Sequence, residues 1–245
     1  MGDTVIIIPT RLKAKRFPGK PLQLINGKEM ILHVLDVAKK SCIGDVLVVT
    51  PDKDILKLVD KNGGNSFLST KNHETGTDRV FEAYDKFYSR KPKNIINLQG
   101  DMPNLEPNSI VQLANHIEKG VCDICTLASS INSDQEIKDE NVVKVLLEKK
   151  IEKVGFSEVL DFKRVLSNSN YKFIYHHIGI YAFTNEALIK YVKLKRSKLE
   201  LERKLEQMRA LENNMTIQVG YTNSNPLSVD TKGDLLKLKK IMENK

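Results

Sequence analysis

The chain has 245 residues, of which 40% are hydrophobic and 29% are charged, a balance typical of globular proteins that excludes an intrinsically disordered chain. No apolar stretch approaches the roughly 20 residues that a membrane-spanning helix needs, so we expect no membrane insertion. The net charge of +8 comes from lysines spread along the chain between acidic residues. That distribution favours a surface that attracts small anions over a nucleic-acid partner.

The N-terminal residues and the cysteines indicate the compartment. An apolar run begins at Val5, directly after Met1-Gly2-Asp3-Thr4, which leaves no length for a secretory signal peptide. Three cysteines are too few for a disulfide framework. Cys122 and Cys125 lie in an apolar segment typical of a strand, and no second pair or nearby histidine completes a zinc site. We therefore expect a cytoplasmic protein with buried thiols.

The first predicted element is a strand followed by a strongly basic loop. The run Val5–Ile8 is continuous and β-branched, which is typical of a strand buried on both faces. Five cations then follow within ten residues: Arg11, Lys13, Lys15, Arg16 and Lys20. Like charges packed together repel one another, and a polyphosphate would turn that repulsion into attraction. The stretch therefore favours a phosphate-binding loop over a merely solvated one.

Short apolar runs and helical periodicities alternate through the first 130 residues. Strands are predicted at Val5–Ile8, Val46–Val49, Ser66–Leu68 and Ile95–Leu98. Helices are predicted from apolar faces at Met30–Ala38, Ile55–Val59, Val80–Phe87 and Ile110–Ile117. Asp52 is the expected cap of the second helix, and Asn26-Gly27 the expected turn of a short hairpin. The alternation predicts an α/β fold with a mostly parallel central sheet flanked by helices, and a site built from the loops after the strands.

The pattern changes in the second half of the chain. An antiparallel hairpin is predicted from Val142–Leu147 and Ile151–Val154, followed by an irregular stretch over Phe156–Asn170. The next predicted elements are a strand at Ile178–Phe183, a helix capped by Asn185, one helix through Leu201–Glu212, a strand at Met215–Val219 and a final helix after Val229-Asp230-Thr231. Because no linker or repeat interrupts the chain, we expect a single domain over residues 1–245 with an inserted β-rich lobe at about 142–209.

Several short motifs are spread along nearly the whole length of the chain. They are Pro9, Arg11, Arg16, Pro18-Gly19-Lys20-Pro21-Leu22, Gly76-Thr77 with Arg79, Asn97 with Gln99-Gly100-Asp101 and Pro103, His177 with Gly179-Ile180-Tyr181, Leu205-Glu206-Gln207 with Arg209, and Asp230-Thr231. Taken together, their order and spacing resemble the cytidylyltransferases that activate 3-deoxy-manno-octulosonate (Kdo), the CMP-Kdo synthetases of lipopolysaccharide biosynthesis. The resemblance implies a Rossmann-like nucleotidyltransferase fold.

The resemblance also implies a reaction and the residues that carry it. CTP and Kdo would give CMP-Kdo and pyrophosphate with the help of Mg²⁺ and without a protein nucleophile. Arg11, Arg16 and Lys20 would hold the triphosphate. The cytosine edge would be read by backbone groups near Pro9 and Thr10 and by Thr77 and Gln99. Asp101 and Asp230 would share Mg²⁺, so that Arg11, Lys20, Asp101 and Asp230 form the catalytic set.

The sugar half of the resemblance is carried by a second group of residues. Arg79, His177, Tyr181, Glu206 and Gln207 would bind the sugar acid. The chain departs from the family pattern at Pro51, Met102 and Glu158, where the family usually has the aspartate of Ala-Thr-Asp, a glutamate and an arginine, and Arg164 could replace the missing arginine. The basic residue before the histidine of the lobe is here His176. A cytidylyltransferase for another sugar acid, such as an acylneuraminate, and a degenerate relative that binds nucleotide without catalysis remain alternatives.

The resemblance further implies a homodimer that forms through the inserted lobe. Tyr171, Phe173, Ile174 and Tyr175 make an apolar and aromatic run just before His177. An exposed patch of this kind is typical of an interface, and a two-fold contact there would also brace His177 and Tyr181.

Overall fold

The computed structural model describes residues 3–13, 16–151, 155–166 and 171–243. The chain divides into two compact units, the first made of Met1–Val111 and Pro226–Lys245 and the second of Gln112–Asn225. The expectation of one domain with an inserted lobe stays a prediction.

The described strands of the first unit form a parallel sheet in the order β5-β4-β1-β6. Their bounds are β1 Thr4–Pro9, β4 Asp45–Thr50, β5 Asn65–Leu68 and β6 Asn94–Asn97. Every residue of β1 is buried, as its β-branched run predicts for a strand with helices on both faces. All four predicted strands are confirmed, and they end at the same edge of the sheet.

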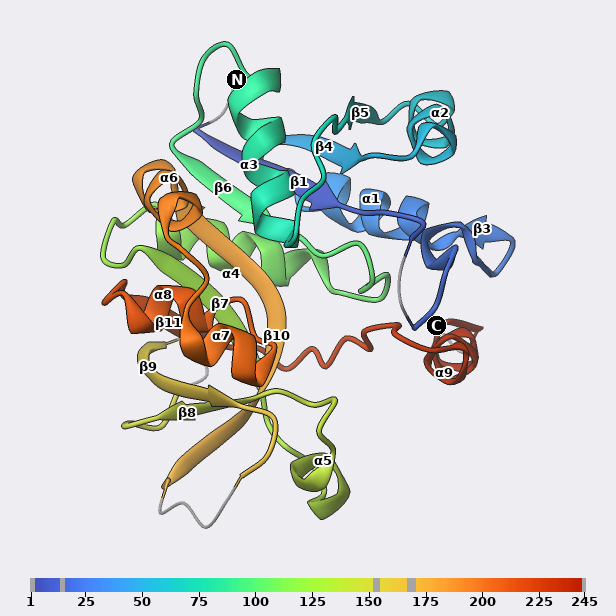
Figure 1. Ribbon diagram of the computed structural model, residues 1–245. Helices are drawn as coiled ribbons and strands as arrows, with labels where there is room; N and C mark the ends of the chain where they lie inside the picture. Colours follow the sequence, from blue (N-terminus) through green and yellow to red (C-terminus); the bar gives the residue numbers. More distant parts are fainter. Residues whose placement is uncertain (1–2, 14–15, 152–154, 167–170, 244–245) are drawn as a thin grey trace. The chain divides into compact units, whose positions relative to one another are not determined.

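Helices cover both faces of this sheet, with α3 on the face opposite α1 (Figure 1). Their bounds are α1 Met30–Lys40, α2 Lys53–Lys61, α3 Gly76–Phe87 and α4 Pro107–Ile117, the last of which spans the boundary between the units. A capping box starts α3, because Thr75 Oγ1 accepts from the Asp78 backbone while Asp78 accepts from the Thr75 backbone. Phe87, predicted to be buried, is 42% exposed, so that part of the helix prediction is wrong.

The C-terminal segment completes the core of the first unit. A short 3-10 helix η1 (Lys20–Leu22) precedes the hairpin β2 (Leu24–Ile25) and β3 (Lys28–Glu29), whose turn residues Asn26 and Gly27 both have positive φ as predicted. The final helix α9 (Lys232–Glu243) packs against this region. One apolar cluster joins Phe17, Ile25, Met30, Val229, Leu235 and Leu238.

The described strands of the second unit close on themselves. Their bounds are β7 Ile124–Ser129, β8 Lys144–Leu147, β9 Phe156–Lys163, β10 Phe173–Thr184 and β11 Ile217–Tyr221. The pairings run β10-β7-β11-β9-β8 and return from β8 to β10. Among the pairings of these described strands, only the one between β7 and β11 is parallel. The long strand β10 pairs with β8 through its first residues and with β7 further along. Its register with β7 shifts between Ile178 and Tyr181.

Three predictions for the second unit are corrected by these strands and helices. The partner of β8 is β9, which lies in the stretch predicted to be irregular, while Ile151 lies outside any strand and residues 152–154 and 167–170 lie outside the described residues. Thr184, not Asn185, caps α6 (Asn185–Lys193) by accepting from the Ala187 backbone. The single helix predicted through Leu201–Glu212 is two, α7 (Lys198–Arg203) and α8 (Met208–Glu212), because Lys204 has a φ of 55°.

A buried ion pair ties α7 to α8. Arg209 donates to both oxygens of Glu200, at 2.8 and 2.7 Å, and Arg196 donates to Glu200 at 2.8 Å. Glu200 and Arg209 are 0% and 2% exposed. The Arg209 guanidinium also lies 4.6 Å from the ring centre of Tyr191. The charges of Glu200 and Arg209 are therefore satisfied inside the second unit.

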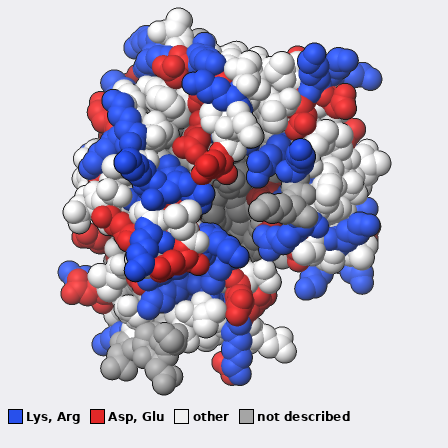
Figure 2. Space-filling model, in the orientation of Figure 1, with Lys and Arg blue, Asp and Glu red and all other residues white. Residues whose placement is uncertain are grey.

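The surface of the described chain carries both signs of charge. On the face shown in Figure 2, lysine and arginine side chains are interspersed with acidic ones. The second unit further contains a short helix, α5 (Asp134–Lys138), which the sequence pattern did not predict. Among the described residues, no helix combines the length and the apolar character that crossing a membrane would require.

Candidate active site

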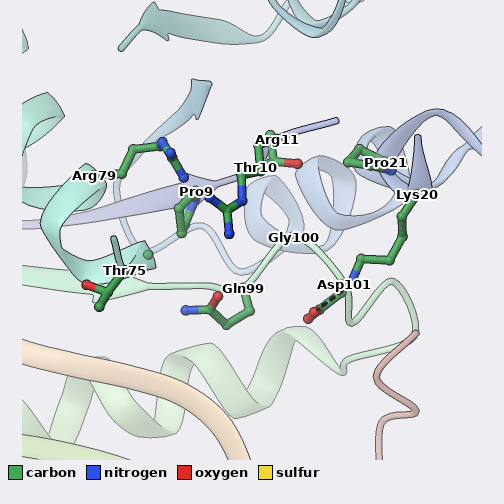
Figure 3. A pocket seen from close by; sticks show the side chains of 11 residues that line it. Pro9, Thr10, Arg11, Lys20, Pro21, Thr75, Arg79, Gln99, Gly100 and Asp101 are labelled. Carbon is green, nitrogen blue, oxygen red and sulfur yellow. Dashed lines mark hydrogen bonds and ion pairs between the residues drawn. The ribbon is translucent and has the colours of Figure 1, made fainter. Parts of the chain in front are cut away.

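A cavity of about 240 Å³ opens at the carboxyl end of the parallel sheet in the first unit. Three segments line it: the loop after β1, the loop after β6 and the first turn of α3 (Figure 3). The lining residues are Pro9, Thr10, Arg11, Lys20, Pro21, Thr75, Gly76, Arg79, Gln99, Gly100 and Asp101. The cavity thus brings together seven residues predicted for the site from the sequence: Pro9, Thr10, Arg11, Lys20, Arg79, Gln99 and Asp101.

Hydrogen bonds to neighbouring elements fold the basic loop after β1 over the end of the sheet. The Thr10 backbone donates to Val49 O at 3.0 Å, and the Leu12 backbone donates to the Asp52 carboxylate at 2.7 Å. Asp52 is at the N-cap of α2, but its side chain makes no capping bond, so its carboxylate serves the loop instead of the helix. Gly19, with a φ of 71°, supplies the left-handed turn that leads into Lys20.

The loops after β1 and β6 approach each other closely at Gly100. A Cβ at this position would lie 3.2 Å from Pro9 O and 3.3 Å from Thr10 Cβ. Both contacts are tighter than ordinary van der Waals distances, and Pro9 O is a backbone atom. Glycine is therefore needed at position 100 to let both loops line one cavity.

A row of polar side chains lies behind the floor of the cavity. Gln99 Nε2 donates to Asn97 Oδ1 at 2.9 Å, and Asn97 Nδ2 donates to Thr77 Oγ1 at 3.1 Å. Asn97 is fully buried and Thr77 is 1% exposed, whereas Gln99 is half-buried and faces the cavity. Thr77, predicted to read the base, does not line the cavity. It is connected to Gln99, which does, through the side chain of Asn97.

Arg79 projects from the first turn of α3 and lies at the same side of the cavity as Arg11 (Figure 3). It is 5% exposed, and its Nε is buried with no hydrogen-bond partner among the described residues. Burial lowers the pKa of Arg79, and the positive charge of Arg11 lowers it further. A buried guanidinium with an unsatisfied donor, facing a second guanidinium, is suited to binding an anion.

Two carboxylates converge on the ammonium group of Lys20. Its Nζ lies 3.0 Å from Asp101 Oδ2 and 3.4 Å from Asp230 Oδ1, and Arg16 Nη2 lies 2.7 Å from Asp230 Oδ2. The Val229 backbone donates to Asp101 O at 3.0 Å, which fixes the C-terminal segment against the loop after β6. Burial lowers the pKa of Lys20, but the two carboxylates outweigh it, so that the net shift is upward.

The segment before α3 is fixed by a buried carboxylate. Glu82, 4% exposed, accepts from Ser69 Oγ at 2.6 Å, Thr70 Oγ1 at 3.0 Å and Lys86 Nζ at 2.8 Å, and it pairs with His73 at 2.7 Å. Burial raises the pKa of Glu82, but these hydrogen bonds outweigh it and lower the pKa well below its usual value. Glu82 therefore anchors the chain that leads to Thr75 and the cavity.

The second group of predicted residues lies in the second unit. His177 is 6% exposed, its Nε2 is 3.0 Å from Thr126 Oγ1, and its ring lies 5.5 Å from that of Tyr181. Burial, with a smaller contribution from the charge of His176, lowers the pKa of His177 to about 3, so its imidazole is neutral. Tyr181 and Gln207 are also buried, and Glu206 is half-buried.

The positions that depart from the family pattern have identifiable surroundings. His176 Nδ1 pairs with Glu136 at 2.6 Å, Glu158 is exposed on β9, and Met102 is buried. The Arg164 guanidinium donates to the backbone carbonyls of Arg203, Glu140 and Lys204, at 3.3, 3.0 and 3.4 Å. Arg164 therefore holds chain segments of the second unit together.

Four contributors to the cavity were not predicted as site residues, although Pro21 and Asn97 belong to the motifs that carry the family resemblance. Thr75 and Pro21 line it, Asp52 fixes the basic loop, and Asn97 connects Gln99 to Thr77. The Thr75-to-Asp78 spacing is a capping-box signature and could have marked the start of α3 at the cavity. Asp52 and Asn97 act through contacts with distant segments, for which the sequence carries no local signal.

The parallel α/β unit, with a cavity lined by Arg11, Lys20 and Arg79 at its strand ends, has the features of the nucleotidyltransferase class. A cytidylyltransferase family profile matches residues 5–217. The chain is 40% identical to the 3-deoxy-manno-octulosonate cytidylyltransferase of Bartonella tribocorum and 38% identical to that of Rhodopseudomonas palustris. Alignments to these two proteins cover 98% of this chain and 98% and 97% of the relatives.

Solved structures agree with this assignment. A CMP:2-keto-3-deoxy-manno-octonic acid synthetase complexed with CTP superimposes with a TM-score of 0.87 at 30% identity over 98% of each chain. A 4-diphosphocytidyl-2C-methyl-D-erythritol synthase from Anaerococcus prevotii shares the fold, with a TM-score of 0.66 at 14% identity over 99% of each chain. The chain belongs to the 3-deoxy-manno-octulosonate cytidylyltransferase family.

Proposed function

We propose that the enzyme binds CTP in the cavity of the first unit and transfers its cytidylyl group to Kdo, giving CMP-Kdo and pyrophosphate for lipopolysaccharide biosynthesis. The observation that carries the proposal is the grouping of Lys20, Asp101 and Asp230 within 3.4 Å at one end of a cavity whose other side holds Gln99 and backbone groups of the strand ends. Relatives named for this reaction match over the full length of the chain.

In this reaction the anomeric hydroxyl of the sugar acid attacks the α-phosphorus of CTP. A new phosphorus–oxygen bond forms, the bond to the bridging oxygen of the β-phosphate breaks, pyrophosphate leaves with the electron pair, and the hydroxyl proton passes to solvent. Lys20, Arg11 and Arg16 hold the phosphates and stabilise the charge on the departing pyrophosphate. Catalysis by this chain is then a matter of positioning and charge stabilisation, as in other phosphoryl transfers.

The carboxylates fit a magnesium ion. Asp101 and Asp230 converge on a single cation, Lys20 Nζ, so both have an oxygen directed at one point. Among the described residues no group of three or more acidic, histidine or cysteine side chains forms a metal cage. Mg²⁺ is commonly held by one or two carboxylates together with substrate phosphates and water. When bound, it would neutralise charge on the α-phosphate.

We propose that His177, Tyr181, Glu206 and Gln207 contribute to binding the sugar acid. Because His177 is neutral, it would act as a hydrogen-bonding group and not as a partner for the sugar carboxylate. The carboxylate would then need another cation. We propose Arg79 as that cation, because its buried Nε has no hydrogen-bond partner among the described residues.

Pyrophosphate release separates the candidate reactions. The assay supplies CTP and Mg²⁺ with Kdo, with N-acetylneuraminate or with no sugar acid. The proposal predicts release with Kdo well above both other conditions. Release only with N-acetylneuraminate would identify an acylneuraminate enzyme. Normal CTP binding with no release under any condition would indicate a relative without catalysis.

We further propose a cytoplasmic homodimer that forms through the second unit and binds no nucleic acid. Tyr171 and Ile174 are half-buried at and beside β10, and Leu160, Val165 and Leu201 are each more than half exposed. Tyr171→Asp with Ile174→Asp should give a folded monomer by light scattering. A wild-type protein that is monomeric at micromolar concentration would contradict the dimer. Titration with random DNA at moderate salt tests whether the protein binds nucleic acid, and we expect no binding.

A further inference from the structure

One buried amide connects two side chains that are proposed to read the base. Asn97 is the last residue of β6 and is 0% exposed. Its carbonyl oxygen accepts from Gln99 Nε2 at 2.9 Å, and its amide nitrogen donates to Thr77 Oγ1 at 3.1 Å. Gln99 lines the cavity, whereas Asn97 lies behind it. Asn97 therefore acts on the cavity only through its neighbours.

The hydrogen bond from Gln99 gives the cavity a defined polarity. Because Gln99 Nε2 is directed at Asn97, the Gln99 carbonyl oxygen lies on the side of Pro9 (Figure 3). With Asn97 in the orientation in which its amide nitrogen donates to Thr77 Oγ1, turning the Gln99 amide alone by half a rotation would place its oxygen against Asn97 Oδ1, two acceptors in contact without a proton. Leaving a buried polar group unpaired costs about 1–3 kcal/mol. Asn97 thus holds Gln99 with an acceptor toward the cavity.

The base of the nucleotide is expected at this part of the cavity. Lys20 and Asp101 lie at the opposite end from Gln99 and Thr75 (Figure 3), and they are the groups suited to phosphates and a metal ion. A nucleotide with its phosphates at Lys20 extends its base toward Gln99. Cytosine carries an amino donor at C4, where uracil carries a carbonyl acceptor. A fixed acceptor therefore favours cytosine and opposes uracil.

We propose that Asn97 is a positioning residue that sets the preference for CTP over UTP by fixing the amide of Gln99. The proposal rests on the proposed function in one respect, namely that the cavity receives CTP. It extends that function by naming a residue outside the cavity that determines which pyrimidine is accepted. Sites built to hydrogen-bond a particular group reject analogues lacking it, because their own buried groups are then left unpaired.

The test measures nucleotide binding without any sugar acid. CTP and UTP are titrated into the wild-type protein and into Asn97→Leu and Asn97→Asp by calorimetry. The leucine variant has a similar volume but accepts nothing from Gln99, and its CTP-to-UTP affinity ratio should fall about tenfold or more. The aspartate variant still accepts from Gln99 Nε2, and the Thr77 hydroxyl is able to donate to it, so it should keep most of the wild-type ratio.

Controls separate positioning from damage to the fold. Ile96→Val alters the buried neighbour on β6 without touching a polar group and should leave the ratio unchanged. If Asn97→Leu does not fold, as judged by circular dichroism, Asn97→Ala carries the same expectation. A wild-type ratio retained in the leucine or alanine variant would overturn the proposal. So would a ratio that collapses equally in the aspartate variant, or a wild-type protein that binds both nucleotides alike.

The outcomes are distinguishable from failure of the proposed function. A wild-type protein that prefers CTP but releases no pyrophosphate with Kdo would contradict the proposed reaction and leave the role of Asn97 standing. If the wild-type protein makes CMP-Kdo but the Asn97→Leu variant keeps the same nucleotide preference, the proposed reaction would stand and the role of Asn97 would be contradicted.

Discussion

Replacing Lys20 by methionine should change the binding of metal and of nucleotide in opposite directions. In the free protein the Lys20 ammonium lies 3.0 Å from Asp101 and 3.4 Å from Asp230, and its side chain is 14% exposed. It therefore occupies the point on which both carboxylates converge. A divalent cation must displace it, whereas the phosphates of CTP gain from its charge.

The size of each effect follows from the contacts. A hydrogen bond to a charged group contributes about 1.5–3 kcal/mol. Removing Lys20 should therefore tighten metal binding to the nucleotide-free protein by about 10- to 150-fold and weaken binding of CTP or pyrophosphate by a similar factor. Mn²⁺ binding followed by electron paramagnetic resonance measures the first effect, and calorimetry with pyrophosphate measures the second.

Lys13 provides a matched control for this experiment. It lies in the same basic loop and is exposed, so Lys13→Met removes the same net charge at a solvent-exposed position. The Lys13 variant should shift both affinities only slightly, because exposed charges are screened by salt. If Lys20→Met binds Mn²⁺ no more tightly than Lys13→Met does, the reasoning about the two carboxylates is refuted.

Asp101→Asn and Asp230→Asn should each lower turnover by roughly 100-fold or more while leaving the thermal transition nearly unchanged, because each removes a charge near the surface that is proposed to bind Mg²⁺; near-normal turnover at limiting Mg²⁺ would contradict the assignment. His177 should contribute a fall of about 1.4 kcal/mol per pH unit to the free energy of unfolding as pH decreases from 6.5 toward 3, since the unfolded state protonates His177 while the folded state, with a pKa of about 3, does not. His177→Gln should reduce this slope by one proton in urea titrations at several pH values, and an unchanged slope would show that His177 is protonated in the fold. Arg209→Met should destabilise the second unit by about 3–5 kcal/mol, because among the described residues it leaves the buried Glu200 carboxylate with Arg196 as its remaining ionic partner, and adding Glu200→Leu should restore much of that loss in the same urea assay.

The first unit could be read from the sequence because its signals are local. Each strand is a short apolar run, each helix shows its own period, and parallel strands place their following loops at one edge of the sheet. That geometry alone brings Arg11, Gln99 and Asp101 near one another. Asp230 is different, because it lies more than 120 residues from Asp101 and no periodicity connects them. Its place beside Lys20 was expected only through the resemblance to a family.

The second unit was read less well because long-range pairing determines its strands. In β9, Glu158 and Asp161 interrupt the apolar alternation, and the strand exists because β8 and β11 pair with its two edges. The apolar line from Leu201 through Met208 is continuous on paper, yet the left-handed conformation of Lys204 breaks the helix there. Such features depend on tertiary contacts that outweigh local preference.

The return of residues 226–245 to the first unit has a consequence for how the enzyme is made. Synthesis proceeds from the N-terminus, and domains generally fold as they emerge. The first unit cannot finish before the second unit is made, because Val229, Leu235 and Leu238 of its apolar cluster and Asp230 of its ion-paired group follow the second unit in the chain. The second unit is translated in between and is complete before them. The ribosome therefore adds the second carboxylate only after the whole second unit, and a chain terminated within the second unit lacks it.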